Sequence, residues 1–386
     1  MKTRAAVLAQ MGKPRPYADT CPLVVEEVDL DGPGPRGALV EVVAAGLCHS
    51  DLSVIDGTRP RPVPIVLGHE AAGIVRAVGP QVTEVRPGDH VVFSFVPSCG
   101  RCEYCTVGRP ALCEPGNRAN AAGVLLSGGT QFRRGTHERL HHHLGVSAFS
   151  QFTVAAVESL VRIDPDLPLE RAALFGCAVI TGVGAVVNTA RVPAGSAVAV
   201  FGMGGVGLSA VMGAHAAGAH PIIAVDVIPA KLDLARRVGA THVVDAFQHD
   251  PVESIRDLTH GGAPYVFESV GSEQVLVQAY HATRRGGVTV AIGLPHPAKQ
   301  LSVPAVGIVA EERTIAGSYM GSAVPRRDIP RFIRLHQAGL LPVERLLSRT
   351  ITLEQLCEAF DALATGAAVR QVVRMADGPV AAQPAG

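Results

Sequence analysis

The sequence lacks an excess of charge of either sign. Lys and Arg together number 34, and Asp and Glu also number 34, so the formal net charge is zero. A protein without a basic surface field has no long-range attraction for nucleic acid or for an anionic membrane surface. The charge balance therefore argues against nucleic-acid and membrane partners.

Long uninterrupted hydrophobic runs are also missing. The apolar stretch SAVAVFGMGGVGLSAVMGAHAAGA is broken by glycines and reads as buried core rather than as a membrane span. The apolar part of the N-terminal stretch MKTRAAVLAQMGKPRPY is too short for the hydrophobic region of a signal peptide. We therefore expect a cytoplasmic protein.

The pattern of turns and apolar runs predicts two kinds of domain in these 386 residues. From about residue 20 to 94, short valine-rich runs alternate with Gly and Pro turns, which predicts an antiparallel, barrel-like β domain. From about residue 169, apolar helical stretches alternate with short apolar strands, which is typical of βαβ units with a parallel sheet. After about residue 320, two amphipathic helical stretches and the strand VRQVVRM predict a return to the first domain. The tail DGPVAAQPAG is expected to be a frayed end.

A glycine-rich turn follows the predicted strand SAVAVF and opens a helix. The turn comprises Gly202, Gly204, Gly205, Val206 and Gly207. Glycines allow a tight turn and a close approach of a pyrophosphate to the helix N-terminus, where free N–H groups attract an anion. About 20 residues later, Asp226 ends the strand PIIAVDV, where a carboxylate accepts hydrogen bonds from an adenosine ribose and repels a 2′-phosphate. This context predicts an NAD site; a tight turn with an incidental Asp is the alternative.

Four of the eight cysteines are crowded into one Gly/Pro-rich loop. They are Cys99, Cys102, Cys105 and Cys113, in the spacing C-x2-C-x2-C-x7-C. One loop with this spacing can wrap four thiolates around a single ion, and a closed shell of four thiolates suits structural zinc. An iron–sulfur cluster is the alternative, although the ferredoxin spacing differs and no second cluster motif is present in the sequence. Without an export signal, such crowding indicates metal ligands rather than disulfides.

A second candidate metal set is dispersed along the chain. It consists of Cys48 in GLCHSD, His69 beside Glu70 in GHE, and Cys177 in FGCAVITG. Two cysteines and one histidine with an open fourth position make a catalytic zinc set. A buried cysteine by itself is more often a small hydrophobic residue, and periodicity alone does not join these residues.

Taken together, the motifs resemble the zinc-dependent medium-chain alcohol dehydrogenases, in the branch of the liver-type and glutathione-dependent formaldehyde dehydrogenase enzymes. The likeness runs from LCHSD through GHEAAGIV, GDHVV, the cysteine loop and LGVSAFSQFTV to AAVRQVV, and so covers essentially the whole chain. It implies an α/β protein with a GroES-like β-barrel catalytic domain and a Rossmann coenzyme domain that has a doubly wound parallel sheet. The expected boundaries are 1–178 for the catalytic domain with both zinc sites, 179–320 for the NAD-binding domain, and 321–386 for the return to the catalytic domain.

The resemblance also implies roles around a catalytic zinc. Cys48, His69 and Cys177 are the implied ligands, with Glu70 as a nearby carboxylate able to visit the metal. Asp51 is the implied partner that orients His69. In this family zinc acts on the alcohol as a Lewis acid, and a hydride passes to the nicotinamide.

The implied proton relay starts at Ser50. This hydroxyl would take the proton of the alcohol and pass it through the nicotinamide ribose toward solvent; a turn-capping hydroxyl is the alternative role. Liver-type members end the relay on a histidine, whereas the matching residue here is Ser53. The implied catalytic group is therefore Ser50, His49, Asp51 and Glu70.

Further residues match family positions that contact the dinucleotide. His49 and Arg370 match positions at the pyrophosphate, Thr181 one near the nicotinamide, and Lys231 one at the adenosine ribose. Ile292 is a further implied cofactor contact. Without the resemblance, an exposed basic residue is usually only a solvated charge.

The implied substrate pocket holds Arg59, Phe95 and Leu144. An aromatic and an aliphatic wall suit a benzylic, allylic or medium aliphatic alcohol. Arg59 stands where liver-type enzymes are apolar and the formaldehyde class is acidic; a cation there either favours an anionic or polar substrate or points to solvent. The neighbouring histidines 141–143 cannot all face one ion on a strand, and we expect a polar loop flank there.

The predicted function is the reversible, NAD-linked oxidation of a primary alcohol to its aldehyde, with two zinc ions per chain. Formaldehyde oxidation that depends on a thiol, glutathione or mycothiol, is the alternative enzyme, and a non-catalytic zinc protein that binds a nucleotide is the alternative outside enzymes. Residues 117–144 resemble the insertion of the dimeric branch, which predicts a homodimer. Some bacterial relatives hold NAD tightly and use another electron acceptor, which leaves the exchange of NAD open.

Overall fold

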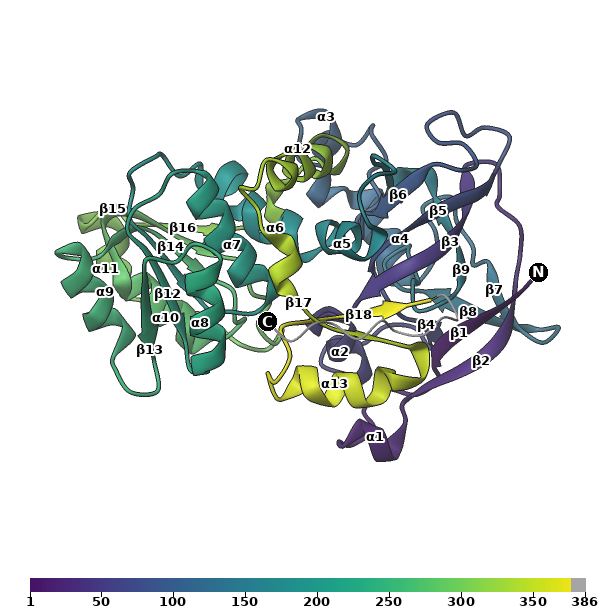
Figure 1. Cartoon of the computed structure of the whole chain (residues 1–386), viewed down its shortest axis with the longest axis horizontal. Coiled ribbons are helices and arrows are strands. Elements are labelled where there is room, and N and C mark those ends of the chain that lie inside the picture. The colour runs from purple at the N-terminus through teal and green to yellow at the C-terminus, as the bar shows by residue number, and fades with distance from the viewer. Residues whose placement is uncertain (376–386) are drawn as a thin grey trace. The chain divides into compact units, whose positions relative to one another are not determined.

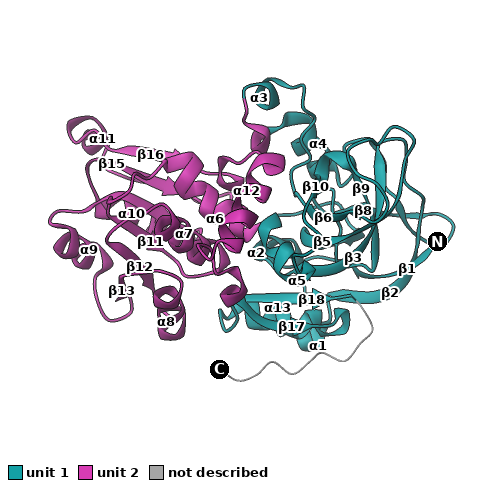
Figure 2. Cartoon of the chain, turned by 45° about the horizontal axis from the view of Figure 1, so that its top comes forward, with its two compact units in different colours: residues 1–107, 113–176, 347–386 teal, residues 108–112, 177–346 magenta. Residues whose placement is uncertain are grey.

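The computed structural model describes residues 1–375 (Figure 1), so the predicted frayed end lies outside the described residues. The chain forms two compact units (Figure 2). Of the described residues, unit 1 comprises 1–107, 113–176 and 347–375, and unit 2 comprises 108–112 and 177–346.

Unit 1 is a β structure with a closed barrel and a second sheet. The barrel has the strand order β1-β2-β7-β8-β4, and the sheet has the order β10-β6-β5-β3-β18-β17, with β9 paired to β3. In β3, Val40 and Val42 are buried while Glu41 between them is partly exposed, which is the alternation of a strand with one face on the core. The strands of unit 1 are β1 (Lys2–Leu8), β2 (Leu23–Leu30), β3 (Gly37–Gly46), β4 (Ile65–Val66), β5 (Glu70–Val78), β6 (His90–Phe93), β7 (Phe132–Arg134), β8 (Glu138–His142), β9 (Phe152–Ala156), β10 (Leu160–Arg162), β17 (Leu347–Ile351) and β18 (Arg370–Arg374).

Short helices connect and cover these strands. The helix α2 follows β3 directly and carries His49 at its first position. The helix α13 packs against α1 and α2 and buries Phe360 in the core of the unit. The helices of unit 1 are α1 (Tyr17–Thr20), α2 (His49–Ile55), α3 (Glu103–Thr106), α4 (Glu114–Ala122), α5 (Leu169–Ala173) and α13 (Leu356–Ala364).

Unit 2 is a six-stranded parallel sheet with the order β13-β12-β11-β14-β15-β16. The central strand β11 is buried at every position, as a strand covered on both faces by helices must be. This is the doubly wound order expected of a dinucleotide-binding sheet, and it confirms the predicted fold class. The elements of unit 2 are α6 (Ala178–Gly184), β11 (Val198–Phe201), α7 (Gly205–Ala216), β12 (Ile222–Asp226), α8 (Pro229–Arg237), β13 (His242–Asp245), α9 (Pro251–Thr259), β14 (Ala263–Glu268), α10 (Glu273–Ala282), β15 (Thr283–Ala291), α11 (Ala305–Ala310), β16 (Thr314–Gly317) and α12 (Pro325–Gln337).

The chain returns to unit 1 at Leu347 and not at residue 321 as predicted. The reason is the packing of α12, which lies against α6 of unit 2. Its apolar face buries Ile329 and Phe332 completely, and its buried Asp328 accepts a hydrogen bond from Asn188 of the same unit. An amphipathic helix packs with its apolar face against another apolar surface. The sequence pattern predicts the apolar face but not the surface that it packs against.

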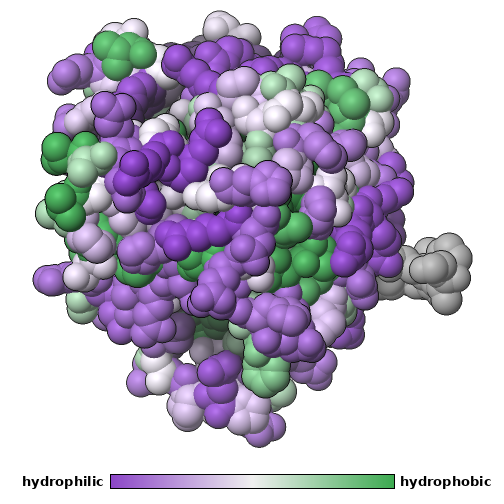
Figure 3. Space-filling view, turned by 90° about the vertical axis from the view of Figure 1, so that its left-hand side faces the viewer, coloured by the Kyte–Doolittle hydropathy of each residue, from purple (hydrophilic) through white to green (hydrophobic). Residues whose placement is uncertain are grey.

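The surface of the molecule mixes polar and apolar side chains. Figure 3 shows hydrophobic side chains in separate patches among polar ones on the face that it presents. Of the helices that the structure describes, none is by itself long and apolar enough to cross a membrane; the successive helical segments Leu169–Gly176 and Ala178–Ala190 pass that test only as a pair.

Candidate functional site

The four cysteines of the loop converge on one point in unit 1. Their sulfur atoms all lie within 4.8 Å of one another, and none of them forms a disulfide. Backbone N–H groups point at two of these sulfurs: Cys102 N lies 3.3 Å from Cys99 Sγ, and Cys99 N lies 3.3 Å from Cys113 Sγ. Such N–H donors stabilise thiolates, which are the form of cysteine that binds metal.

The protonation of this cluster supports a cation at its centre. The backbone N–H of Cys105 lowers the pKa of Cys102 to about 6, whereas burial raises the pKa of Cys105 to about 12 and also raises that of Cys113. Four thiolates this close repel one another, so without a cation some of them stay protonated. A divalent ion removes that conflict, and the set of four sulfurs fits zinc in a closed structural site.

The dispersed set also comes together. The ligand atoms of Cys48, His69 and Cys177 all lie within 4.8 Å of one another, and all three residues are buried. Cys48 immediately precedes α2, His69 immediately precedes β5, and Cys177 directly follows Gly176, the last residue of this part of unit 1. Two sulfurs and one nitrogen supply three of the four positions that zinc takes, which is the donor set of a catalytic site.

Asp51 fixes the orientation of His69. Its Oδ1 lies 3.1 Å from His69 Nδ1 and accepts a hydrogen bond from the backbone N–H of Gly68 at 3.1 Å. Burial alone would raise the pKa of Asp51, but the imidazoles of His69 and His143 outweigh burial and bring it to about 2. Because Nδ1 of His69 faces the carboxylate, Nε2 is the nitrogen left for a metal.

His143 is the residue at this site that the sequence analysis missed. The predicted polar loop flank is wrong: His142 ends β8, and His142 and His143 are at most 1% exposed. His143 Nδ1 lies 3.1 Å from Asp51 Oδ1, and its ring meets that of His69 edge-on at 5.5 Å. In β8, Leu140 and His142 face the interior of the barrel, whereas His141 between them is partly exposed. The leucines on either side of the three histidines, Leu140 and Leu144, were the available signal for burial.

One of the predicted pocket residues, Phe95, contacts a metal ligand in unit 1. The ring of Phe95 meets that of His69 edge-on at 5.7 Å, and Leu144 is buried beside His143 in the chain. Arg59 is half-buried, and its backbone N–H donates to the carbonyl of Ser53 at 2.7 Å. These positions leave the role of the Arg59 guanidinium a prediction.

The relay residues lie on the first turns of α2. His49 is exposed and Ser50 is half-buried. The hydroxyl of Ser53 donates to the carbonyl of Ser50 at 3.0 Å, so this hydroxyl is used within the helix. The proton relay and the step that would end it stay predictions.

Glu70 and Arg370 form a buried pair next to the metal ligands. Glu70 Oε2 lies 3.5 Å from Arg370 Nη2, and Arg370 Nη1 donates to the carbonyl of Leu47 at 2.6 Å. A Cβ at Gly46 would lie 2.7 Å from Glu70 Oε1, so this glycine makes room for the carboxylate. The predicted contact of Arg370 with a pyrophosphate stays a prediction.

The glycine-rich turn of unit 2 is tight, and two of its positions accept only glycine. Gly202 has φ +88, and a Cβ at Gly207 would lie 1.7 Å from the carbonyl oxygen of Gly202, which only glycine avoids. The carboxylate of Asp226 is fixed beside this turn, because its Oδ2 accepts from the backbone N–H of Met203 at 2.6 Å. Lys231 follows on α8, and Thr181 lies on α6 with 9% of its surface exposed.

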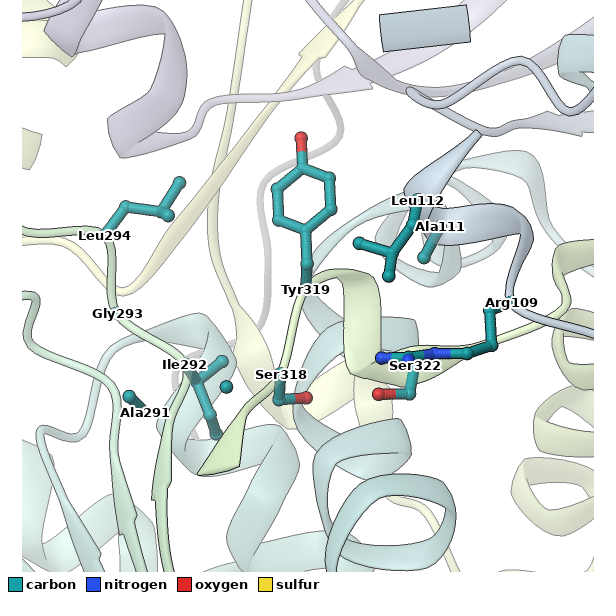
Figure 4. Close-up of a pocket in the computed structure, with 11 residues that line it drawn as sticks. Arg109, Ala111, Leu112, Ala291, Ile292, Gly293, Leu294, Ser318, Tyr319 and Ser322 are labelled. Carbon is teal, nitrogen blue, oxygen red and sulfur yellow. The ribbon is translucent and has the colours of Figure 1, made fainter. Parts of the chain in front are cut away.

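A pocket of about 360 Å³ opens at the carboxyl ends of β15 and β16 in unit 2 (Figure 4). In a parallel sheet of this kind, ligands bind beyond the carboxyl ends of the strands. The predicted cofactor residue Ile292 lines the pocket, together with Tyr319 and Arg109, whose side chain reaches toward Ser322 in Figure 4. The sequence analysis singled out neither Tyr319 nor Arg109, and no local motif marks them.

Comparison with known proteins agrees with this geometry. Residues 34–165 match the alcohol dehydrogenase GroES-like domain, and residues 205–338 match the zinc-binding dehydrogenase family. The chain is 41% identical over 379 residues to the NDMA-dependent alcohol dehydrogenase of Amycolatopsis methanolica, covering 97% of this chain and 99% of that one. The chain belongs to the zinc-dependent medium-chain alcohol dehydrogenases. As a member of this family it is an enzyme that works with zinc and an NAD(H)-type cofactor.

Other relatives carry different substrate names. The S-(hydroxymethyl)glutathione dehydrogenase of Escherichia coli is 38% identical over 378 residues, covering 97% of this chain and all of that one. The solved benzyl alcohol dehydrogenase of Acinetobacter calcoaceticus is 32% identical with a TM-score of 0.90, covering 97% of this chain and all of that chain. Family membership therefore identifies the type of reaction that the enzyme catalyses but does not identify its substrate.

Proposed function

We propose that this enzyme oxidises a primary alcohol reversibly to its aldehyde, with NAD as the hydride acceptor. The observation that carries the proposal is the buried group of Cys48, His69 and Cys177, whose ligand atoms lie within 4.8 Å of one another. A zinc ion held there would act on the alcohol oxygen as a Lewis acid. A second zinc ion would stabilise the loop of four cysteines, which gives two per chain.

Other residues of the chain would orient a zinc ligand, transfer the proton and bind the adenosine ribose. Asp51 holds His69 in one tautomer and orientation, and Ser50 would accept the proton of the alcohol at its Oγ and release it toward the nicotinamide ribose. Asp226, fixed beside the glycine turn, would accept hydrogen bonds from the adenosine ribose. Its negative charge supports NAD over NADP.

The substrate we propose is an aromatic, allylic or medium aliphatic alcohol. Phe95 packs edge-on against His69, and Leu144, which is buried in the same unit, would extend this apolar wall. The 32% identity to a benzyl alcohol dehydrogenase agrees with an aromatic substrate.

Thiol-dependent formaldehyde oxidation is the second candidate. It is favoured by the 38% identity to an S-(hydroxymethyl)glutathione dehydrogenase. A non-catalytic zinc protein is disfavoured, because the three ligands and Ser50 are all present.

We further propose that the enzyme is a homodimer and that it is located in the cytoplasm.

The test is a zinc determination followed by an activity panel. NADH formation is measured with benzyl alcohol, aliphatic alcohols, and formaldehyde with and without glutathione or mycothiol. Activity on the alcohols supports the main proposal, and activity only with formaldehyde and a thiol supports the second candidate. A parallel assay with NDMA as electron acceptor detects turnover by tightly bound cofactor, and a protein that holds zinc but is inactive in every assay contradicts both candidates.

A further inference from the structure

Two histidines face the same buried carboxylate. Oδ1 of Asp51 lies 3.1 Å from Nδ1 of His69 and 3.1 Å from Nδ1 of His143. Asp51 is fully buried, and each histidine is 1% exposed, so water does not separate the three groups. His69 also belongs to the set with Cys48 and Cys177, whereas His143 groups only with Asp51 and His69, whose ligand atoms likewise lie within 4.8 Å of one another.

The carboxylate selects the tautomer of both rings. A lone pair on Nδ1 facing a carboxylate oxygen is repelled, whereas an N–H is attracted, so each ring carries its proton on Nδ1. His69 is hydrogen-bonded to Oδ1, and His143 lies at the same distance but without the alignment of a good hydrogen bond. Its contact is therefore an attraction between the N–H dipole and the charge of Asp51.

This contact opposes the usual effect of the carboxylate on a metal ligand. A carboxylate that accepts the N–H of a ligating histidine makes that histidine a stronger metal donor. A second N–H beside the same oxygen takes up part of the negative charge and leaves less of it for His69. The remaining oxygen, Oδ2, is buried and accepts no hydrogen bond from the residues that the structure describes, so the polar contacts of this carboxylate are concentrated on Oδ1.

We propose that His143 is a positioning residue that shares the Asp51 carboxylate with His69 and thereby weakens the hold of His69 on the catalytic zinc. The proposal rests on the proposed function, because it takes Cys48, His69 and Cys177 as the zinc ligands. The contrasting role is packing alone, in which His143 only fills space beside His69. The two roles differ when the N–H is removed and the ring is kept: sharing of the carboxylate predicts slower zinc release, whereas packing alone predicts no slowing.

The first experiment measures the rate at which the cofactor-free, zinc-loaded enzyme releases zinc to a coloured chelator. His143→Phe keeps a ring in the space and removes the N–H, and we expect release from the catalytic site to slow by about three- to tenfold, at the lower end of effects at residues behind a metal ligand. His143→Asn places an amide N–H near the position of Nδ1 and should restore the wild-type rate. Unchanged or faster release in His143→Phe, or slow release in both variants, would overturn the proposal.

Two controls separate the possible failures. Cys177→Ser should lack the catalytic zinc, so its release trace identifies the phase that belongs to the four cysteines. His142→Phe changes the buried histidine next to His143 without touching the contacts of Asp51, and its release rate should equal that of the wild type. If the wild-type enzyme holds only one zinc, the proposed function fails before His143 is tested.

A second measurement uses the unaltered enzyme and does not depend on the folding of a variant. Nitrogen-15 NMR of the zinc-loaded protein, labelled at histidine, distinguishes protons on Nδ1 from protons on Nε2. We expect both His69 and His143 to carry the proton on Nδ1. A proton on Nε2 of His143 would overturn the proposal, since Nδ1 would then have nothing to donate.

Discussion

Cys177 is one of the three candidate ligands of the catalytic zinc. It is buried, and its sulfur lies within 4.8 Å of the ligand atoms of Cys48 and His69. A serine oxygen at this position is a poorer ligand for zinc than a thiolate. We therefore expect Cys177→Ser to fold with one zinc per chain in place of two and to show no detectable alcohol oxidation.

Metal analysis and circular dichroism measure these outcomes. Cys21→Ser is the matched control, because Cys21 is exposed and belongs to none of the groups that could hold a metal, and it should keep two zinc ions and full turnover. Turnover by Cys177→Ser at the wild-type rate would remove Cys177 from the catalytic site.

Asp226 is the residue that we expect to choose between NAD and NADP. Replacing it by Asn removes the charge that repels a 2′-phosphate and keeps one of the two side-chain oxygens as an acceptor for the backbone N–H groups of Met203, Val227 and Ile228. The ratio of kcat/KM for NADP to that for NAD should rise by about tenfold, equivalent to about 1.4 kcal/mol. Asp233→Asn, an exposed position on α8, should leave the ratio as it is. An unchanged ratio in Asp226→Asn would mean that another residue reads the ribose.

At the scale of elements, the turn from β11 into α7 contains two glycines that are required for different reasons. A Cβ at Gly207 would collide with the carbonyl of Gly202 inside the protein, whereas a Cβ at Gly204 would meet no protein atom within 4 Å. We expect Gly207→Ala to lower thermal stability and to weaken NAD binding. Gly204→Ala should keep the stability of the wild type and weaken NAD binding only, because the cofactor itself must approach that backbone.

Thermal unfolding and a titration with NADH separate the two effects. If Gly204→Ala bound the cofactor as tightly as the wild type, the pyrophosphate would not lie against this turn. If Gly207→Ala were as stable as the wild type, the turn would be able to move aside.

The loop between β5 and β6 is tied to the start of β3 by an ion pair that should control stability in acid. Burial would raise the pKa of Glu84, but the hydrogen bonds from Arg36 and the backbone of Thr83 outweigh it and bring the pKa to about 2. A depressed pKa in the folded state means that the stabilisation is present above the unfolded value, about 4.3, and is lost as the pH falls toward 2.

Glu84→Gln should therefore lower the free energy of unfolding at pH 7 by about 1 kcal/mol, since both partners are partly exposed. Its stability should also fall less steeply than that of the wild type between pH 4 and 2. Urea unfolding at several pH values measures both slopes, and parallel slopes in the two proteins would show that another carboxylate controls this range.

At the scale of the whole molecule, one edge of unit 2 supports the proposed homodimer. The strand β16 ends the six-stranded sheet, and α11 just before it exposes Val306 at 72% and Val309 at 79%. An open sheet edge beside exposed apolar side chains is typical of a surface that another chain covers. A second copy of this chain, paired edge to edge, is the partner that we propose.

Sedimentation equilibrium tests this assembly. The wild type, with a chain mass of 40.1 kDa, should sediment at about twice that mass, as expected for a closed dimer. Val309→Asp should shift the equilibrium toward the monomer. Phe247→Asp, at an exposed position after β13 at the opposite end of the sheet, should not. A wild type that sediments as a monomer contradicts the proposal.

The sequence by itself determined the features that depend on neighbours in the chain. The loop of Cys99, Cys102, Cys105 and Cys113 and the glycine turn before α7 are complete within short segments, so their spacing alone predicts a metal site and a dinucleotide site. Alternation of apolar runs likewise predicted a barrel-like β unit and a parallel-sheet unit, because periodicity reports which faces are buried. The family resemblance, confirmed by the comparisons, supplied what spacing could not.

Only the tertiary structure decided which distant residues meet. Cys48, His69 and Cys177 are far apart along the chain, yet their ligand atoms lie within 4.8 Å of one another. The burial of the histidines before Leu144 depends on closure of the barrel, and the place of α12 on unit 2 depends on the partner for its apolar face. The contact of His143 with Asp51 also depends on tertiary packing. The sequence pattern determines which face of a strand a side chain takes, but only the packing of the folded chain determines which residue it contacts there.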